Sequence, residues 1–137
     1  MRAFPTTAAA VVISLFMLCQ GVSLAGMGRN TEGNLFRIEL RIDPPQPVVG
    51  SNAALLDVYD AKSNEKIDDA TIEVIPWMTM HSHGSSKKPT VHKQGSGQYR
   101  VEDIYYTMEG DWDLLITIQK KGTKDTATFP ISHVIKK

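Results

Sequence analysis

The sequence has very little cysteine, and its only cysteine lies close to the N-terminus. Cys19 is the single cysteine among 137 residues, so a disulfide within the chain is excluded. The chain also lacks an excess of either charge, because its 15 basic side chains are balanced by 15 acidic ones. Nothing in that balance favours binding to nucleic acid or to an acidic membrane surface.

Long apolar runs are scarce as well, and the longest uncharged one lies near the start. The segment 6–18 is almost wholly apolar or small, which is short for a membrane span. It follows a basic start at Arg2, and the small residues Ser23 and Ala25 suit a signal peptidase. We therefore predict a secretory signal peptide over 1–25. The alternative is an uncleaved N-terminal anchor, and both place the rest of the chain outside the cytoplasm, either periplasmic or secreted.

Cleavage after residue 25 would remove the cysteine and one arginine. The remaining 112 residues carry 14 basic and 15 acidic side chains, a net charge of −1. That length suits one domain with one core, which must be stabilised by packing alone. The polar, glycine-rich segment 26–34 is predicted to be a flexible lead-in, and 35–137 to be the folded domain.

Helical periodicity is also missing, since no window of eleven or more residues after the signal shows a 3.6-residue repeat. Apolar side chains instead alternate with polar ones, which indicates strands with one buried face. The expected strands are 35–42, 53–59, 70–77, 90–93, 99–105 with an irregularity before Ile104, 112–119 and 127–135. Seven or eight strands separated by turn signals predict an all-β, immunoglobulin-like antiparallel β-sandwich.

A segment rich in methionine and histidine follows the strand expected at 70–77. It reads Trp77-Met78-Thr79-Met80-His81-Ser82-His83-Gly84, and it holds two of the chain's six methionines and two of its four histidines. Thioether sulfur and imidazole nitrogen suit a soft late transition metal, above all Cu(I). Metal binding is therefore the sharpest functional hypothesis, and copper is the expected cofactor.

An extended chain would place the two methionines on one side of the strand and the two histidines on the other. One ion can take both pairs only if the chain bends, and the Ser82–Gly84 segment is where we expect a turn. The candidate ligands are Met78, Met80, His81, His83, Met108 and His92. A three-ligand set of the first two methionines with His81 or His83 suits Cu(I).

Other readings of the same residues stay open. A histidine-only set of His81, His83 and His92 would suit Cu(II) or Zn(II) instead. The ring of Trp77 could cover a soft cation. Two methionines at i and i+2 on a strand are, however, most often core residues.

Further motifs connect the cluster to a known family. The chain contains His83-Gly84, Pro89, Gly97-Gln98-Tyr99 and Met108-Glu109-Gly110-Asp111-Trp112, and upstream it has Pro47-Val48-Val49-Gly50-Ser51-Asn52. In this order the motifs resemble the YtkA-like family, which is related to the FixH family, over residues 35–132. The resemblance implies an extracytoplasmic immunoglobulin-like β fold and accessory roles in copper handling or respiratory oxidase assembly.

The chain departs from the family pattern at one point. The family usually has Met-Pro-x-Met before its His-Gly pair, whereas Thr79 stands here in place of the proline. We therefore expect a straighter strand through this segment. Tyr99 and Trp112, which belong to the shared motifs, are predicted to be core aromatics that pack across the sandwich.

No catalytic constellation is identifiable, so we do not expect an enzyme. The first hypothesis is a periplasmic protein that binds or shuttles Cu(I) and exchanges it with a copper donor or acceptor protein. The second is a metal-free interaction module that presents an edge strand or the histidine-rich loop to an envelope or respiratory complex. The direction of the side chains at 78–83 distinguishes the two, because buried methionines favour the second.

Overall fold

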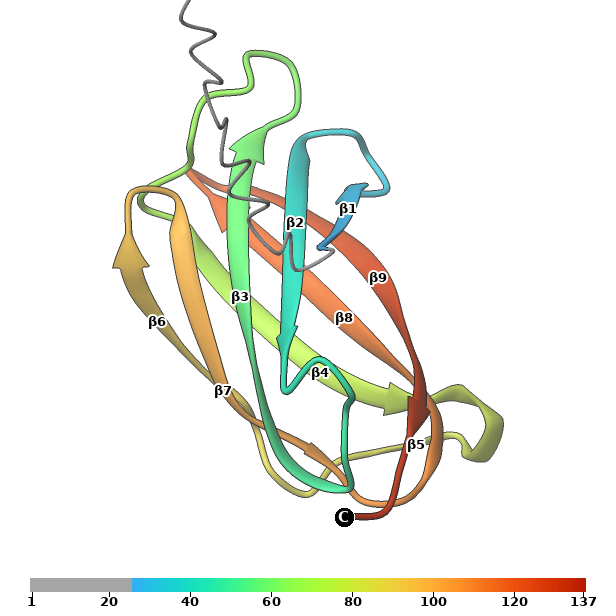
Figure 1. Cartoon of the computed structure of the whole chain (residues 1–137). Coiled ribbons are helices and arrows are strands. Elements are labelled where there is room, and N and C mark those ends of the chain that lie inside the picture. The colour runs from blue at the N-terminus through green and yellow to red at the C-terminus, as the bar shows by residue number, and fades with distance from the viewer. Residues whose placement is uncertain (1–25) are drawn as a thin grey trace, which may run out of the picture.

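The computed structural model describes residues 26–137 and is a sandwich of two antiparallel sheets (Figure 1). One sheet has the strand order β1-β2-β3-β7-β6, and the other has the order β5-β4-β8-β9. The strands are β1 (Met27–Asn30), β2 (Phe36–Asp43), β3 (Gly50–Asp60), β4 (Thr71–Met78), β5 (His83–Gly84), β6 (Thr90–Gly95), β7 (Gln98–Tyr106), β8 (Gly110–Lys120) and β9 (Thr123–Val134). Within the described range, the helical structure is a single 3-10 turn, η1 (Thr79–His81).

The strand order confirms the predicted fold class. Strands β2-β3-β7-β6 facing β4-β8-β9 reproduce the two sheets of an immunoglobulin constant-type domain. The short strands β1 and β5 are added at the sheet edges, which gives nine strands where the sequence suggested seven or eight.

The core lies between the sheets and is built by the period-two pattern of the strands. On β8 the residues Trp112, Leu114, Ile116 and Ile118 are all buried. They face buried apolar residues of the other sheet, among them Ile38, Leu40, Leu56, Val58 and Val101. Removing these side chains from water is the main stabilising contribution to the fold.

Two edge strands and one irregularity refine the sequence-based picture. Strand β1 pairs with β2 inside the segment 26–34, for which we predicted a flexible lead-in. Strand β5 pairs with the end of β4. Such short edge strands are held by backbone hydrogen bonds, so they leave no apolar period in the sequence. The predicted irregularity before Ile104 is confirmed, since Asp103 has a positive φ of 57°.

The described residues contain no helix that is long and apolar enough to cross a membrane. The predicted signal peptide over 1–25 lies outside the described residues.

A carboxylate at the start of β9 connects the two sheets at the edge where β1 lies. Asp125 accepts a hydrogen bond from the Thr31 hydroxyl at 2.6 Å and others from the backbone N–H groups of Gly33 and Leu35 at 3.0 and 3.3 Å. Partial burial by itself raises the pKa of Asp125. The hydrogen bonds from Thr31, Gly33, Leu35 and Thr126 outweigh that effect and lower the pKa below its ordinary value.

We predict that this carboxylate makes folding stability depend on acid pH. The pKa of Asp125 in the folded state lies below the unfolded value of about 3.9. The contribution of Asp125 to the free energy of unfolding is therefore complete above that unfolded value and is lost as the pH falls through the folded pKa. Asp125→Asn should lower the free energy of unfolding by about 1–2 kcal/mol at pH 7 and flatten its decline toward pH 3. Urea unfolding at both pH values measures this, with Glu73→Gln on the exposed face of β4 as control. Equal stability of Asp125→Asn and wild type at pH 7 would contradict the prediction.

Candidate functional site

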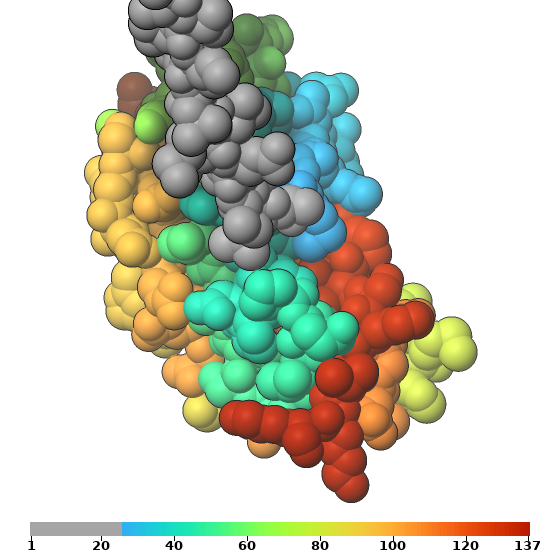
Figure 2. All heavy atoms as spheres, viewed as in Figure 1, coloured from blue at the N-terminus to red at the C-terminus, as the bar shows by residue number. Residues whose placement is uncertain are grey.

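The methionine- and histidine-rich segment forms a tight turn that projects from one end of the sandwich. Strand β4 ends at Met78, the 3-10 turn η1 follows, and Ser82 adopts a left-handed conformation with φ of 52°. The chain then returns as β5, with Trp77 opposite Gly84 and Met78 opposite His83. Figure 2 shows this segment in yellow-green, protruding beyond the strands coloured orange and red. The chain thus leaves the strand at Thr79, three residues before the turn expected at Ser82–Gly84, and the straighter strand predicted from Thr79 is wrong.

The turn separates the two methionines. Met78 is only 2% exposed and belongs to the hydrophobic core, whereas Met80 is 84% exposed. The methyl carbon of Met78 lies beneath the β7–β8 turn, because a Cβ added to Gly110 would be 3.0 Å from it. Met78 therefore fills the end of the core, and the sulfur of Met80 is free for a ligand.

The same turn brings the two histidines together. The ring centroids of His81 and His83 are 5.9 Å apart. His83 is opposite Met78 across the β4–β5 pair, so its side chain lies on the side of the sheet that faces the core. Nδ1 of His83 is 3.1 Å from the Gly84 carbonyl oxygen. A proton on Nδ1 would be donated to that oxygen and would leave the lone pair of Nε2 available to a metal.

The buried ring of Trp112 packs against His83, one of these two histidines. The two rings meet edge-on, with centroids 5.6 Å apart and an interplanar angle of 77°. The indole Nε1–H donates to the Met108 carbonyl at 3.0 Å, which ties the β7–β8 turn to the start of β8. The Tyr106 ring also packs against Trp112, with the two ring centroids 5.3 Å apart. Trp112 thus contacts both His83 and the turn that carries Met108, whose side chain is 38% exposed.

An aspartate on β8 holds the outer side of the β4–β5 turn. The hydroxyl of Thr79, the first residue of η1, donates to Asp113 Oδ2 at 2.8 Å. Sequence reasoning did not find this contact, because the two residues are 34 positions apart and only the β4–β8 pairing brings them together.

Two further residues were considered for the site. His92 lies in the other sheet, and Trp77 faces outward from the end of β4. His92 is on β6 in the other sheet and exposed, next to Val91, which shares a hollow with Thr71 and Ile72 at the start of β4. Because a strand rises about 3.3 Å per residue, that position is about 20 Å from the end of β4. Trp77 points away from the core, and its ring lies over Gly84, where an added Cβ would be 3.3 Å from the indole.

The histidine-only alternative is not assembled. Among residues 26–137 no group of three or more histidine, cysteine, aspartate or glutamate side chains is placed to hold a metal ion. What the described chain brings together is a pair of imidazoles; Met80 is exposed on the same turn, and Met108 lies on the β7–β8 turn that contacts Trp112. That mixture of nitrogen and thioether donors is soft, and it is suited to Cu(I) more than to Zn(II).

The fold and this cluster define an immunoglobulin-like β-sandwich with a Met/His turn at one end. The chain belongs to the YtkA-like family, whose model matches residues 32–117, and the resemblance described above is confirmed. No curated protein was found to match the sequence.

Two solved structures are similar to this chain in fold. One is a DUF4426 family protein from Pseudomonas aeruginosa PAO1, with a TM-score of 0.55 and 6% identity, covering 80% of this chain and 96% of that one. The other is a copper-bound variant of FetP from uropathogenic Escherichia coli, with a TM-score of 0.52 and 10% identity, covering 80% and 95%. At these identities the likeness shows the shared fold alone.

The contrast between the two methionines is directly testable by truncation. Met78→Ala should lower the free energy of unfolding by about 2–4 kcal/mol, because it leaves a cavity beneath the β7–β8 turn. Met80→Ala should change it by less than about 0.5 kcal/mol, because that side chain is in solvent. Urea unfolding followed by far-UV circular dichroism measures both. Similar losses for the two variants would mean that the turn is packed differently.

Proposed function

We propose that this protein binds Cu(I) outside the cytoplasm, at the end of the sandwich where the β4–β5 and β7–β8 turns meet. The observation that carries the proposal is the 5.9 Å separation of the His81 and His83 ring centroids. A metal about 2.0 Å from one nitrogen of each ring lies about 3 Å from each ring centre, so two rings on one ion have centres about 5–6 Å apart. The pair is already near the spacing that a shared ion requires.

A thioether completes the proposed ligand set. Met80 is the middle residue of η1 and is exposed, and Met108 lies on the turn that Trp112 ties down. In the proposed set, either Met80 or Met108 supplies the third ligand. Met78 remains a weaker candidate, because its burial means that the core would have to open. His92 is left outside the proposed set.

This ligand chemistry suits the compartment that the N-terminal sequence predicts. Thioethers and imidazoles hold Cu(I) without forming disulfides, so the site would survive in an oxidising environment. A two- or three-coordinate site at an exposed turn would exchange its ion by ligand replacement. The protein would thus buffer Cu(I), or it would receive the ion from a donor protein and pass it to an acceptor protein, without catalysis of its own. The copper-bound FetP structure supports the proposal to the extent that the same fold carries copper there.

We predict one equivalent of tightly bound Cu(I) for residues 26–137, measured anaerobically against a chromophoric chelator. His81→Ala should weaken binding by about tenfold or more, because it removes one of two nitrogen ligands. Met80→Leu and Met108→Leu should show which sulfur participates, since leucine keeps the volume and removes the donor. Affinity should fall at acid pH, because a protonated imidazole cannot bind the metal.

Matched controls come from the same residue types elsewhere in the fold. His92→Ala removes an exposed histidine from the other sheet, and Met27→Leu removes a thioether from β1. Both should bind Cu(I) like the wild type. The proposal fails if the wild type does not compete with the chelator, or if these controls lower the affinity as much as His81→Ala.

A second candidate function is favoured by the burial of Met78 in the core. In it the sandwich is a metal-free accessory module that binds an envelope or respiratory complex, as the FixH relationship implies. If the folded wild-type protein does not compete with the chelator for Cu(I), this second function would be the one favoured.

A further inference from the structure

One strand of the smaller sheet has an edge that is largely unpaired. On one side β4 pairs with β8 from Thr71 to Trp77, but on the other side β5 covers only Trp77 and Met78. Within the described range 26–137, the six residues 71–76 therefore have no strand neighbour on that side. In an antiparallel sheet alternate residues direct their N–H and C=O groups to such an edge, where they can pair with another chain.

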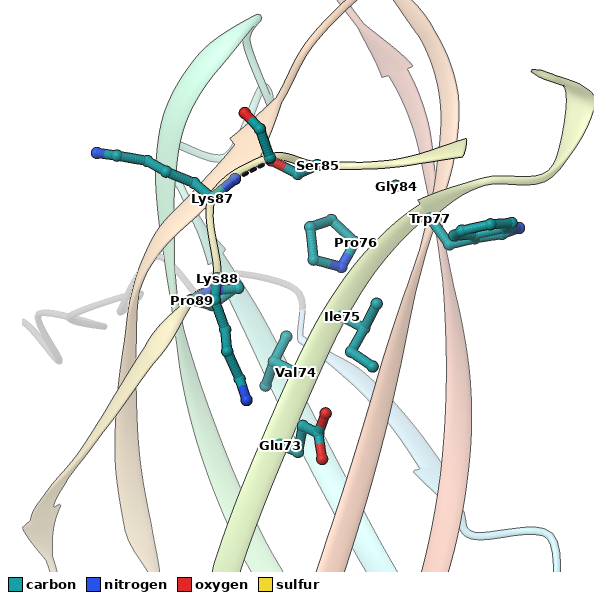
Figure 3. Close-up of a pocket in the computed structure, with 11 residues that line it drawn as sticks. Glu73, Val74, Ile75, Pro76, Trp77, Gly84, Ser85, Lys87, Lys88 and Pro89 are labelled. Carbon is teal, nitrogen blue, oxygen red and sulfur yellow. Dashed lines mark hydrogen bonds between the residues drawn. The ribbon is translucent and has the colours of Figure 1, made fainter. Parts of the chain in front are cut away.

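A hollow follows this free edge. Figure 3 shows β4 on one side and the connection from β5 to β6 on the other, with the hollow between them. Its volume is about 580 Å³, and it is lined by residues 73–77 of β4 and by residues 84–89 of the connection. A further hollow of about 450 Å³ lies beside Thr71 and Ile72. Both therefore lie along the same strand.

The hollow is flanked by apolar side chains, and its charged lining residues are Glu73 on β4 and Lys87 and Lys88 on the connection from β5 to β6. Val74 is buried, whereas Ile75 is 41% exposed and Trp77 is 38% exposed on the outer face. In Figure 3 the Lys88 side chain extends along β4, whereas Lys87 points away from the hollow. Lys87 pairs with Asp103 at 3.3 Å, but Lys88 makes no ion pair within residues 26–137. Lys88 is thus the cation available to an occupant.

From these features we propose that the free edge of β4 binds an extended acidic segment of another protein by strand addition. The segment would pair with the backbone of residues 71–76, place its apolar side chains on the inner side beside Val74, and direct the intervening carboxylates to the outer side toward Lys88. Six paired residues span about 20 Å, and main-chain hydrogen bonds supply the affinity in this mode of recognition. Pro76 has no N–H to donate, so the ladder would end there, next to β5.

The connection between β5 and β6 favours a single added strand over a second folded domain. It passes along the outer side of the hollow, so the space beside β4 is bounded by protein on two sides (Figure 3). A single extended peptide suits such a space. The edge strand of another sheet would carry neighbouring strands with it, and these would clash with the connection between β5 and β6. The proposal does not depend on the metal site at the far end of β4.

The test uses ¹⁵N-labelled residues 26–137, which contain every strand of both sheets, and a capped hexapeptide alternating aspartate and valine. Titration to millimolar peptide should shift the backbone amide resonances of residues 71–75. A peptide with alternate backbone nitrogens methylated should bind about tenfold more weakly, because it loses the donors for the ladder. A peptide with lysine in place of aspartate should also bind more weakly, as should Lys88→Glu, by about threefold.

Lys124→Glu, in the exposed β8–β9 hairpin, is the matched charge control and should bind like the wild type. Absence of shifts at residues 71–75, or equal binding of the methylated peptide, would overturn the proposal. Shifts of the same amides on raising the protein concentration without peptide would also overturn it, because a second copy of the chain would then cover the edge.

Discussion

The end of the sandwich that carries the candidate site depends on the buried indole of Trp112. Its N–H holds the β7–β8 turn through the Met108 carbonyl, and its ring edge supports His83 of β5. Immunoglobulin-like domains use a tyrosine in a similar way at the corresponding corner, where its hydroxyl bonds to the backbone a few residues upstream. Here the tryptophan does so and also positions a histidine. Two turns that are distant in sequence are thereby fixed against one surface.

This arrangement explains why a Met/His cluster can be stable without a disulfide or a preformed metal cage. The β4–β5 turn is anchored on its inner side by Met78 in the core and on its outer side by Thr79 bonded to Asp113. Met80 and His81, which follow these two anchoring residues, are exposed. A site of this kind has a rigid base and accessible ligands, which is what an exchangeable soft ion requires.

The sequence alone predicted most of the fold, because period-two alternation reports directly which side chains face the core. The burial of Trp112 and Tyr99 followed from the same reasoning and is confirmed. The burial of Met78 and the exposure of Met80 could not be predicted, because residues two apart on an extended strand share a face. Their separation depends on a 3-10 turn held by Asp113, a contact made only after β8 has paired with β4. Strand β1 was not predicted, because its pairing with β2 uses backbone N–H and C=O groups, which every sequence has.

In the proposed site, one Cu(I) ion is bound by the imidazoles of His81 and His83 and by one methionine sulfur. X-ray absorption at the copper edge of the Cu(I)-loaded protein identifies these ligands. We expect two nitrogen scatterers at about 2.0 Å and one sulfur scatterer at about 2.3 Å. A first coordination shell without sulfur, or a spectrum of unbound copper, would contradict this ligand set.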